Sequence, residues 1–129
     1  YNALAGNDGL GVVPDVVEIL ESGEVELLFF NGMNDVIVNH VSNEIALEAL
    51  PYSKVGDFKH AKRQIWSGGL PGTGPLGPRG WLKSAPPLHY LKIAESGHMV
   101  PMDQPELALE MIRELLGGRI GGAKEQRLG

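Results

Sequence analysis

The sequence predicts an α/β protein in which helices cover the two faces of a sheet. Helix and strand patterns alternate along the 129 residues, as is typical of this class. Residues 25–30 are nearly continuously apolar and lie between chain breakers, which predicts a strand buried on both faces of a parallel sheet. The 18 glycines and 9 prolines leave little regular structure for an independent core. We therefore expect one segment of a larger domain over residues 1–129, with a core at 12–117 and a loose tail at 118–129.

The first helix is predicted between Pro14 and Gly23. Proline fits a first helical turn, where its missing N–H costs nothing, and glycine favours the left-handed cap at a helix end. The apolar face of this helix comprises Val16, Val17 and Leu20. The strand at 25–30 follows and ends at Asn31 and Gly32.

Asn39 predicts the N-cap of a second helix, which runs to about residue 50 and is stopped by Pro51. Its apolar face comprises Val41, Ile45 and Ala49. Residues 52–61 are polar and predict an irregular connection. Two short strands follow at 62–66 and 81–83, joined as a long hairpin by a loop rich in glycine and proline.

A further strand is expected over residues 88–93, ending at the turn that contains His98. The last helix then starts at Asp103, a natural N-cap, with Pro105 in the first turn and Glu106 completing a capping-box-like pattern. Its apolar face comprises Ala108, Met111, Ile112 and Leu115, and two glycines at 117 and 118 close it.

Composition excludes several classes of function. The net charge of −5 argues against a nucleic-acid partner, which needs a basic face. No apolar run approaches the roughly 20 residues of a membrane span. The absence of cysteine removes disulfides and cysteine nucleophiles. The four histidines have no metal-ligand spacing, so we expect no metal and no cofactor.

Residues 72–77 spell the dinucleotide-binding pattern G-x-G-x-x-G. In that motif the third glycine lies inside a helix whose N-terminus faces the pyrophosphate. Pro75 and Pro78 prevent such a helix here, and no buried strand precedes it. We interpret the segment as a surface loop.

Asp35 and His98 are the candidate catalytic residues. Each follows an apolar run at a glycine-containing turn, and ligands of open α/β sheets bind at the carboxyl ends of strands. A serine hydroxyl needs an imidazole to take its proton, and the imidazole needs a buried carboxylate to fix its tautomer. Asp35 also suits a local helix cap or Asx-turn. Among the other histidines, His60 and His89 are expected to face solvent and His40 to pack locally.

At these residues the chain resembles the C-terminal part of the serine carboxypeptidases, the carboxypeptidase Y and cathepsin A group of α/β-hydrolases. Residues 30–39, Phe-Asn-Gly-Met-Asn-Asp-Val-Ile-Val-Asn, are similar to the family's [YF]-x-G-D-x-D-x-x-x-N segment. Residues 97–101, Gly-His-Met-Val-Pro, match its histidine motif in full. The resemblance covers about residues 12–117. Met33 replaces the first acid of the aspartate segment, Val38 replaces a usual cysteine, and the nucleophile motif G-E-S-Y-[AG]-G is absent.

The resemblance implies a fold and a set of roles. The fold is the C-terminal portion of an α/β-hydrolase, and the activity is removal of C-terminal residues from peptides. Asp35 orients His98, the general base, and Met99 lines the pocket for the leaving residue. The partner is a large chain or N-terminal segment that carries the serine, and the compartment is vacuolar, lysosomal or secreted. Two alternatives stay open: a non-catalytic structural remnant, and an acyltransferase or lyase on the same scaffold.

Overall fold

The computed structural model describes residues 11–68 and 78–122. Its four strands form one mixed sheet in the order β1-β4-β3-β2. β1 (Leu27–Gly32) pairs in parallel with β4 (Leu88–Ile93), whereas β3 (Gly80–Ala85) pairs antiparallel with both β4 and β2 (Gln64–Trp66). The predicted parallel sheet pair and the predicted hairpin are confirmed. Residues 72–77, in the loop of that hairpin, lie outside the described residues.

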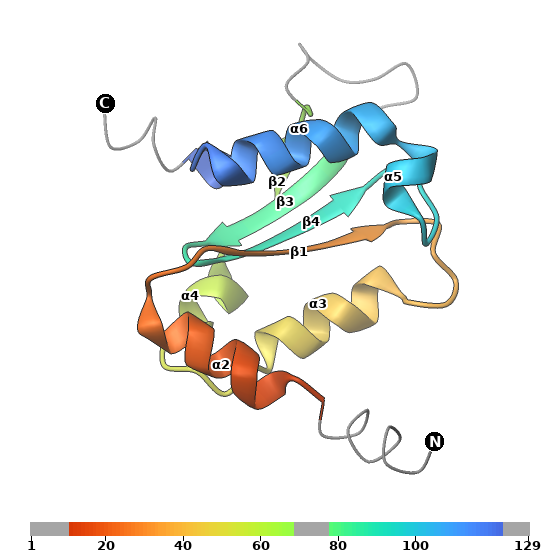
Figure 1. Ribbon diagram of the computed structural model, residues 1–129. Coiled ribbons are helices and arrows are strands. Elements are labelled where there is room, and N and C mark those ends of the chain that lie inside the picture. Colours follow the sequence, from red (N-terminus) through yellow and green to blue (C-terminus); the bar gives the residue numbers. More distant parts are fainter. Residues whose placement is uncertain (1–10, 69–77, 123–129) are drawn as a thin grey trace.

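Helices lie on both faces of the sheet, as the α/β class requires (Figure 1). One face is covered by α2 (Val13–Ser22), α3 (His40–Glu48) and α4 (Val55–His60). The other is covered by α5 (Val100–Asp103), α6 (Pro105–Leu116) and the 3-10 turn η1 (Ile120–Gly122). This three-layer arrangement confirms the predicted fold class.

The two faces of the sheet have separate apolar cores, because alternate residues of β4 point to opposite sides. The core under α2, α3 and α4 contains Leu20, Leu47, Leu50, Tyr52, Phe58, Leu88 and Tyr90. The core under α5 and α6 contains Trp66, Leu82, Leu91, Ile93, Val100, Leu107, Ala108, Met111 and Ile120. All six residues of β4 are buried, so β4 is the central strand that both cores share.

β1 is less buried than the sequence predicts. Its first three residues are half-buried and Phe30 is exposed. The reason is its place in the sheet: within the described residues β1 is an edge strand, with β4 on one side only.

Three expectations about helices are wrong. Residues 52–61 contain a helix, α4, whose Phe58 is fully buried; six residues with one core side chain give too weak a periodic signal. The sheet-facing residues of α3 are Glu44 and Leu47, whereas Val41 and Ile45 are exposed.

The third correction concerns the last helix. α6 begins at Pro105 with Gln104 at the N-cap, and no side chain caps it. Leu107 replaces Ile112 on its buried face. Asp103 belongs to the preceding turn, α5, and its carboxylate is engaged elsewhere.

Candidate active site

Asp35 and His98 meet at the carboxyl end of the parallel pair β1 and β4. The register joins Gly32 to Ile93, so the loops that follow the two strands emerge side by side. The His98 Nδ1 atom lies 2.8 Å from the Asp35 Oδ2 atom. The contact that the sequence predicts between these two residues is therefore present.

The Asp35 carboxylate is held in place by the backbone that follows it. Its Oδ1 atom accepts hydrogen bonds from the N–H groups of Ile37 and Val38, both at 2.9 Å. The hydrogen bond from Val38, followed by those from His98 and Ile37, outweighs burial and lowers the pKa of Asp35. The carboxylate is thus ionised at neutral pH and can only accept. It follows that His98 Nδ1 carries the proton and donates to Oδ2.

Burial of the two partners is unequal. The Asp35 side chain is 3% exposed and the His98 side chain 55% exposed. The second ring nitrogen, Nε2, has no hydrogen-bond partner among the described residues. A buried carboxylate therefore orients an imidazole whose basic nitrogen faces outward, as general base catalysis requires.

The loops that carry this pair are packed backbone against backbone. A Cβ atom on Gly32 would lie 2.2 Å from the Gly97 carbonyl oxygen and 2.3 Å from that of Ser96. Asn34 N–H donates to the Ser96 carbonyl at 2.9 Å. Gly32, which the sequence indicates only as a strand terminator, is needed because any side chain would separate the two loops.

Met99, the predicted substrate-binding residue, directly follows His98 and is exposed. Its backbone carbonyl accepts from the N–H groups of Met102 and Asp103, which fixes the start of α5. Met102 is also exposed. Two exposed methionines therefore follow His98 closely in the chain, and the pocket role of Met99 stays a prediction.

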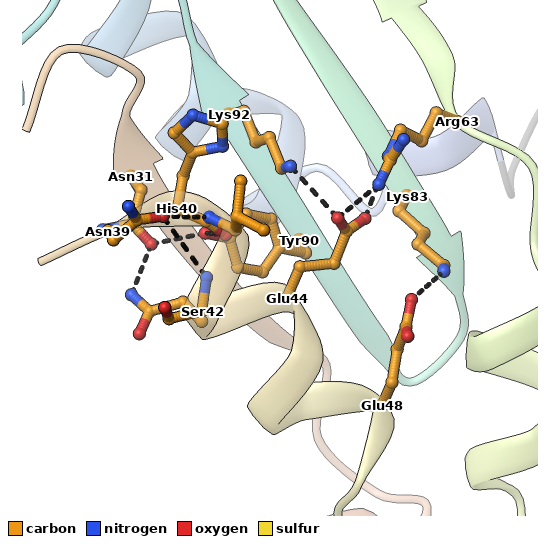
Figure 2. A network of polar contacts seen from close by, with 12 residues as sticks. Asn31, Asn39, His40, Ser42, Glu44, Glu48, Arg63, Lys83, Tyr90 and Lys92 are labelled. Atoms are coloured by element: carbon orange, nitrogen blue, oxygen red, sulfur yellow. Dashed lines mark hydrogen bonds and ion pairs between the residues drawn. The ribbon is translucent and has the colours of Figure 1, made fainter.

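An ionic network centred on the buried Glu44 lies on the α3 face of the sheet (Figure 2). The Glu44 carboxylate accepts from Arg63 at 2.5 and 3.0 Å and from Lys92 at 3.1 Å. Burial opposes its ionisation, but these hydrogen bonds outweigh burial and lower the pKa of Glu44 to about 2. Lys83 pairs with Glu48 at 2.6 Å on the same face. The sequence analysis missed this network, although a glutamate among the apolar residues of α3 and lysines within β3 and β4 are its signals.

His89 differs from its predicted exposure: its side chain is fully buried. Its Nδ1 atom lies 2.5 Å from Ser84 Oγ, and its Nε2 atom contacts the Glu26 carboxylate. Gly121 covers Ser84, since a Cβ there would lie 2.4 Å from Ser84 Oγ. This cluster is at the start of β4, the opposite end of the strand from His98. His60 is exposed, as predicted, and His40 is half-buried.

Over residues 11–68 and 78–122, no group of three histidine, aspartate or glutamate side chains is placed to hold a metal ion. No helix in this part of the chain has the length and apolar character needed to cross a membrane.

Comparison with known proteins identifies the family. The family model described as serine carboxypeptidase matches residues 3–118. Carboxypeptidase Y of Schizosaccharomyces pombe is 37% identical over 106 residues, which is 82% of this chain and 10% of that protein. A serine carboxypeptidase-like protein of Pisum sativum is 36% identical over 102 residues, or 79% of this chain and 33% of that protein. Serine carboxypeptidase 3 of Oryza sativa is 35% identical over 104 residues, or 79% of this chain and 19% of that protein.

The chain belongs to the serine carboxypeptidase family of α/β-hydrolases. It spans about a tenth to a third of the length of the first curated relatives it matches. Family membership agrees with the resemblance of the aspartate and histidine segments, and with a sheet that is only part of a larger domain.

Proposed function

We propose that Asp35 and His98 are the acid and the base of a serine carboxypeptidase triad. The nucleophilic serine lies in a segment or partner chain outside these 129 residues. The observation that supports this most strongly is the 2.8 Å contact between a buried carboxylate and an exposed imidazole at the ends of paired parallel strands. The family to which the chain belongs makes peptides the expected substrate.

In this mechanism His98 Nε2 removes the proton from the serine hydroxyl as its oxygen attacks the last peptide carbonyl. The resulting imidazolium is stabilised by the ionised Asp35, which stays unprotonated. His98 then gives that proton to the departing amine of the C-terminal residue, leaving an acyl-enzyme. Water, deprotonated by the same nitrogen, hydrolyses the ester and restores the serine.

None of the six serines in the chain lies in a G-x-S-x-G context, which is the usual setting of the nucleophile on this scaffold. We therefore expect the 129-residue chain alone to hydrolyse no peptide. Within the described residues β1 has a neighbouring strand on one side only, and we expect the serine-bearing part to add to the sheet there, since open edges pair readily. We expect the chain to co-purify with that part, or to self-associate without it. A monodisperse, active monomer of these residues would contradict both expectations.

The test uses the complete protein and an N-blocked dipeptide with a free C-terminal carboxylate. We expect release of the C-terminal amino acid, loss of turnover after treatment with a fluorophosphonate, and no turnover of the matching C-terminal amide. Transfer of the acyl group to an alcohol without hydrolysis would support an acyltransferase. Failure to turn over any such substrate, with no serine labelled, would support a non-catalytic protein. A vacuolar, lysosomal or secreted location is part of the same proposal and is tested by fractionation.

A further inference from the structure

The loop that carries His98 is held by hydrogen bonds from outside it. Gly97 N–H donates to Asp103 Oδ2 at 2.7 Å. Gln104 Nε2 donates to the Glu95 carbonyl at 3.1 Å. Two successive side chains at the end of α5 therefore bind the backbone on both sides of Ser96, just before the imidazole.

This loop contains a residue in a conformation that needs support. Glu95 has a φ of 54°, in the left-handed region that side chains other than glycine rarely adopt. Such residues persist when surrounding contacts fix them. The hydrogen bond that Asp103 accepts from Gly97 and the one that Gln104 donates to Glu95 supply contacts of this kind, just after β4 ends.

Asp103 is itself fixed to the core. Val100, in the same helical turn, is 2% exposed within the α6-side core. The N–H groups of Asp103 and Gln104 donate to the carbonyls of Met99 and Val100 at 3.0 and 2.8 Å. The carboxylate that accepts from the Gly97 N–H thus belongs to a hydrogen-bonded turn that is anchored in the core by Val100.

The other role available to Asp103, capping the last helix, is not the one observed. Gln104 occupies the N-cap of α6, and no side chain makes a cap hydrogen bond there. Loss of the Asp103 carboxylate therefore leaves the hydrogen bonds of α6 intact and releases only Gly97.

We propose that Asp103 is a positioning residue for His98. By accepting a hydrogen bond from the Gly97 N–H, it fixes the Ser96–Gly97 peptide, one residue before His98, and keeps Nδ1 within 2.8 Å of Asp35. The role is geometric: an acceptor oxygen at this point is required and its charge is secondary. As a statement about rate, the inference rests on the proposed function.

The experiment compares Asp103→Ala, Asp103→Asn and Gln104→Ala in the complete protein, with Asp57→Ala as the control at an exposed aspartate. A loop displaced by about 1 Å costs up to roughly 10²-fold in rate. We expect Asp103→Ala to lower kcat by roughly 10- to 100-fold with KM nearly unchanged, and Gln104→Ala to lower it less. Asp103→Asn keeps an acceptor oxygen and should restore most of the rate, while Asp57→Ala should match the wild type.

A second readout does not depend on turnover. The downfield proton NMR signal of His98 Nδ1–H, bonded to Asp35, should be present in the wild type and Asp103→Asn and lost in Asp103→Ala. Wild-type kcat with an intact signal in Asp103→Ala would overturn the proposal, as would an Asp103→Asn variant as impaired as Asp103→Ala. If Asp103→Ala does not fold, Asp103→Asn and Asp103→Glu carry the test. Asp103→Asn should keep the NMR signal and most of the rate, whereas Asp103→Glu, whose longer side chain moves the acceptor oxygen, should lose both. Retention of both in Asp103→Glu overturns the geometric role. An inactive wild type would refute the proposed function, and the NMR signal would still decide the role of Asp103.

Discussion

The described part of the chain contains two pairs of a carboxylate and a histidine, at opposite ends of β4, with inverted burial. At the carboxyl end, Asp35 is 3% exposed and His98 is 55% exposed. At the other end, Glu26 is 42% exposed and His89 is fully buried. Both pairs span 63 residues of sequence. A contact between a carboxylate and a histidine therefore does not by itself indicate a catalytic role.

What differs is which partner can reach a substrate. His98 uses Nδ1 for Asp35, and its Nε2 atom has no partner in the described part of the chain. Both ring nitrogens of His89 are engaged, by Ser84 and Glu26, and Gly121 covers Ser84. The first pair can therefore move protons to and from a ligand, whereas the second joins β3, β4 and the residue that precedes β1.

Removal of each imidazole should give opposite results, and this is the largest expected difference. In the complete protein, His98→Ala should lower kcat by roughly 10⁴- to 10⁶-fold and change the free energy of unfolding by less than about 1 kcal/mol. His89→Ala leaves a cavity and removes the partner of the half-buried Ser84 hydroxyl, so it should lower the free energy of unfolding by about 2–4 kcal/mol. Its kcat should stay near wild type at temperatures where it is folded. Urea unfolding and initial rates measure both; equal losses of rate would break the comparison.

Replacing each carboxylate by its neutral amide tests which of the two must fix the tautomer of its histidine for activity. Asp35→Asn keeps the shape but presents an amide that can favour the wrong ring tautomer, so kcat should fall by about 10⁴-fold. Glu26→Gln should leave kcat unchanged and alter the free energy of unfolding by less than about 1 kcal/mol, because the Glu26 side chain is substantially exposed. A rate loss in Glu26→Gln similar to that in Asp35→Asn would show that the two ends are not independent.

The smallest expected effect concerns a third carboxylate, Glu44, which is buried like Asp35 but paired with two cations. The pKa of Glu44 is lowered to about 2 in the folded protein, below its ordinary value of 4.5. A lowered folded-state pKa adds stability that is fully present above pH 4.5 and is lost as the pH falls to about 2. Glu44→Gln should therefore be less stable at pH 7 and lose less stability between pH 4.5 and 2. Chemical unfolding at several pH values measures this, and parallel curves for both proteins would contradict it.

The candidate site was largely predictable because its signals are local. Asp35 and His98 each follow an apolar strand within a few residues, and adjacent parallel strands place their carboxyl ends together. The histidine motif and the aspartate segment each lie within ten residues. Gly32 belongs to the same segment, but its contact with Gly97 depends on how two distant loops pack, and no local pattern reports that.

The remaining features depend on long-range pairing. No local pattern around Glu26 indicates that it contacts His89. The prediction that His89 faces solvent therefore depended on the alternating pattern of its own strand alone. The buried face of α3 is set by Arg63 and Lys92, which allow Glu44 to be buried and leave Ile45 exposed. Asp103 fits the local pattern of a helix cap, yet its carboxylate accepts from the Gly97 N–H, a contact that depends on how the His98 loop packs against α5.

The most direct test of the account is the reaction of a fluorophosphonate with the complete wild-type protein and with His98→Ala and His89→Ala. The reagent reports activation of a serine independently of substrate preference. The account predicts labelling of one serine, outside these 129 residues, in the wild type and in folded His89→Ala, and almost none in His98→Ala. Labelling of His98→Ala at the wild-type rate would contradict the assignment of His98 as the base that activates the serine.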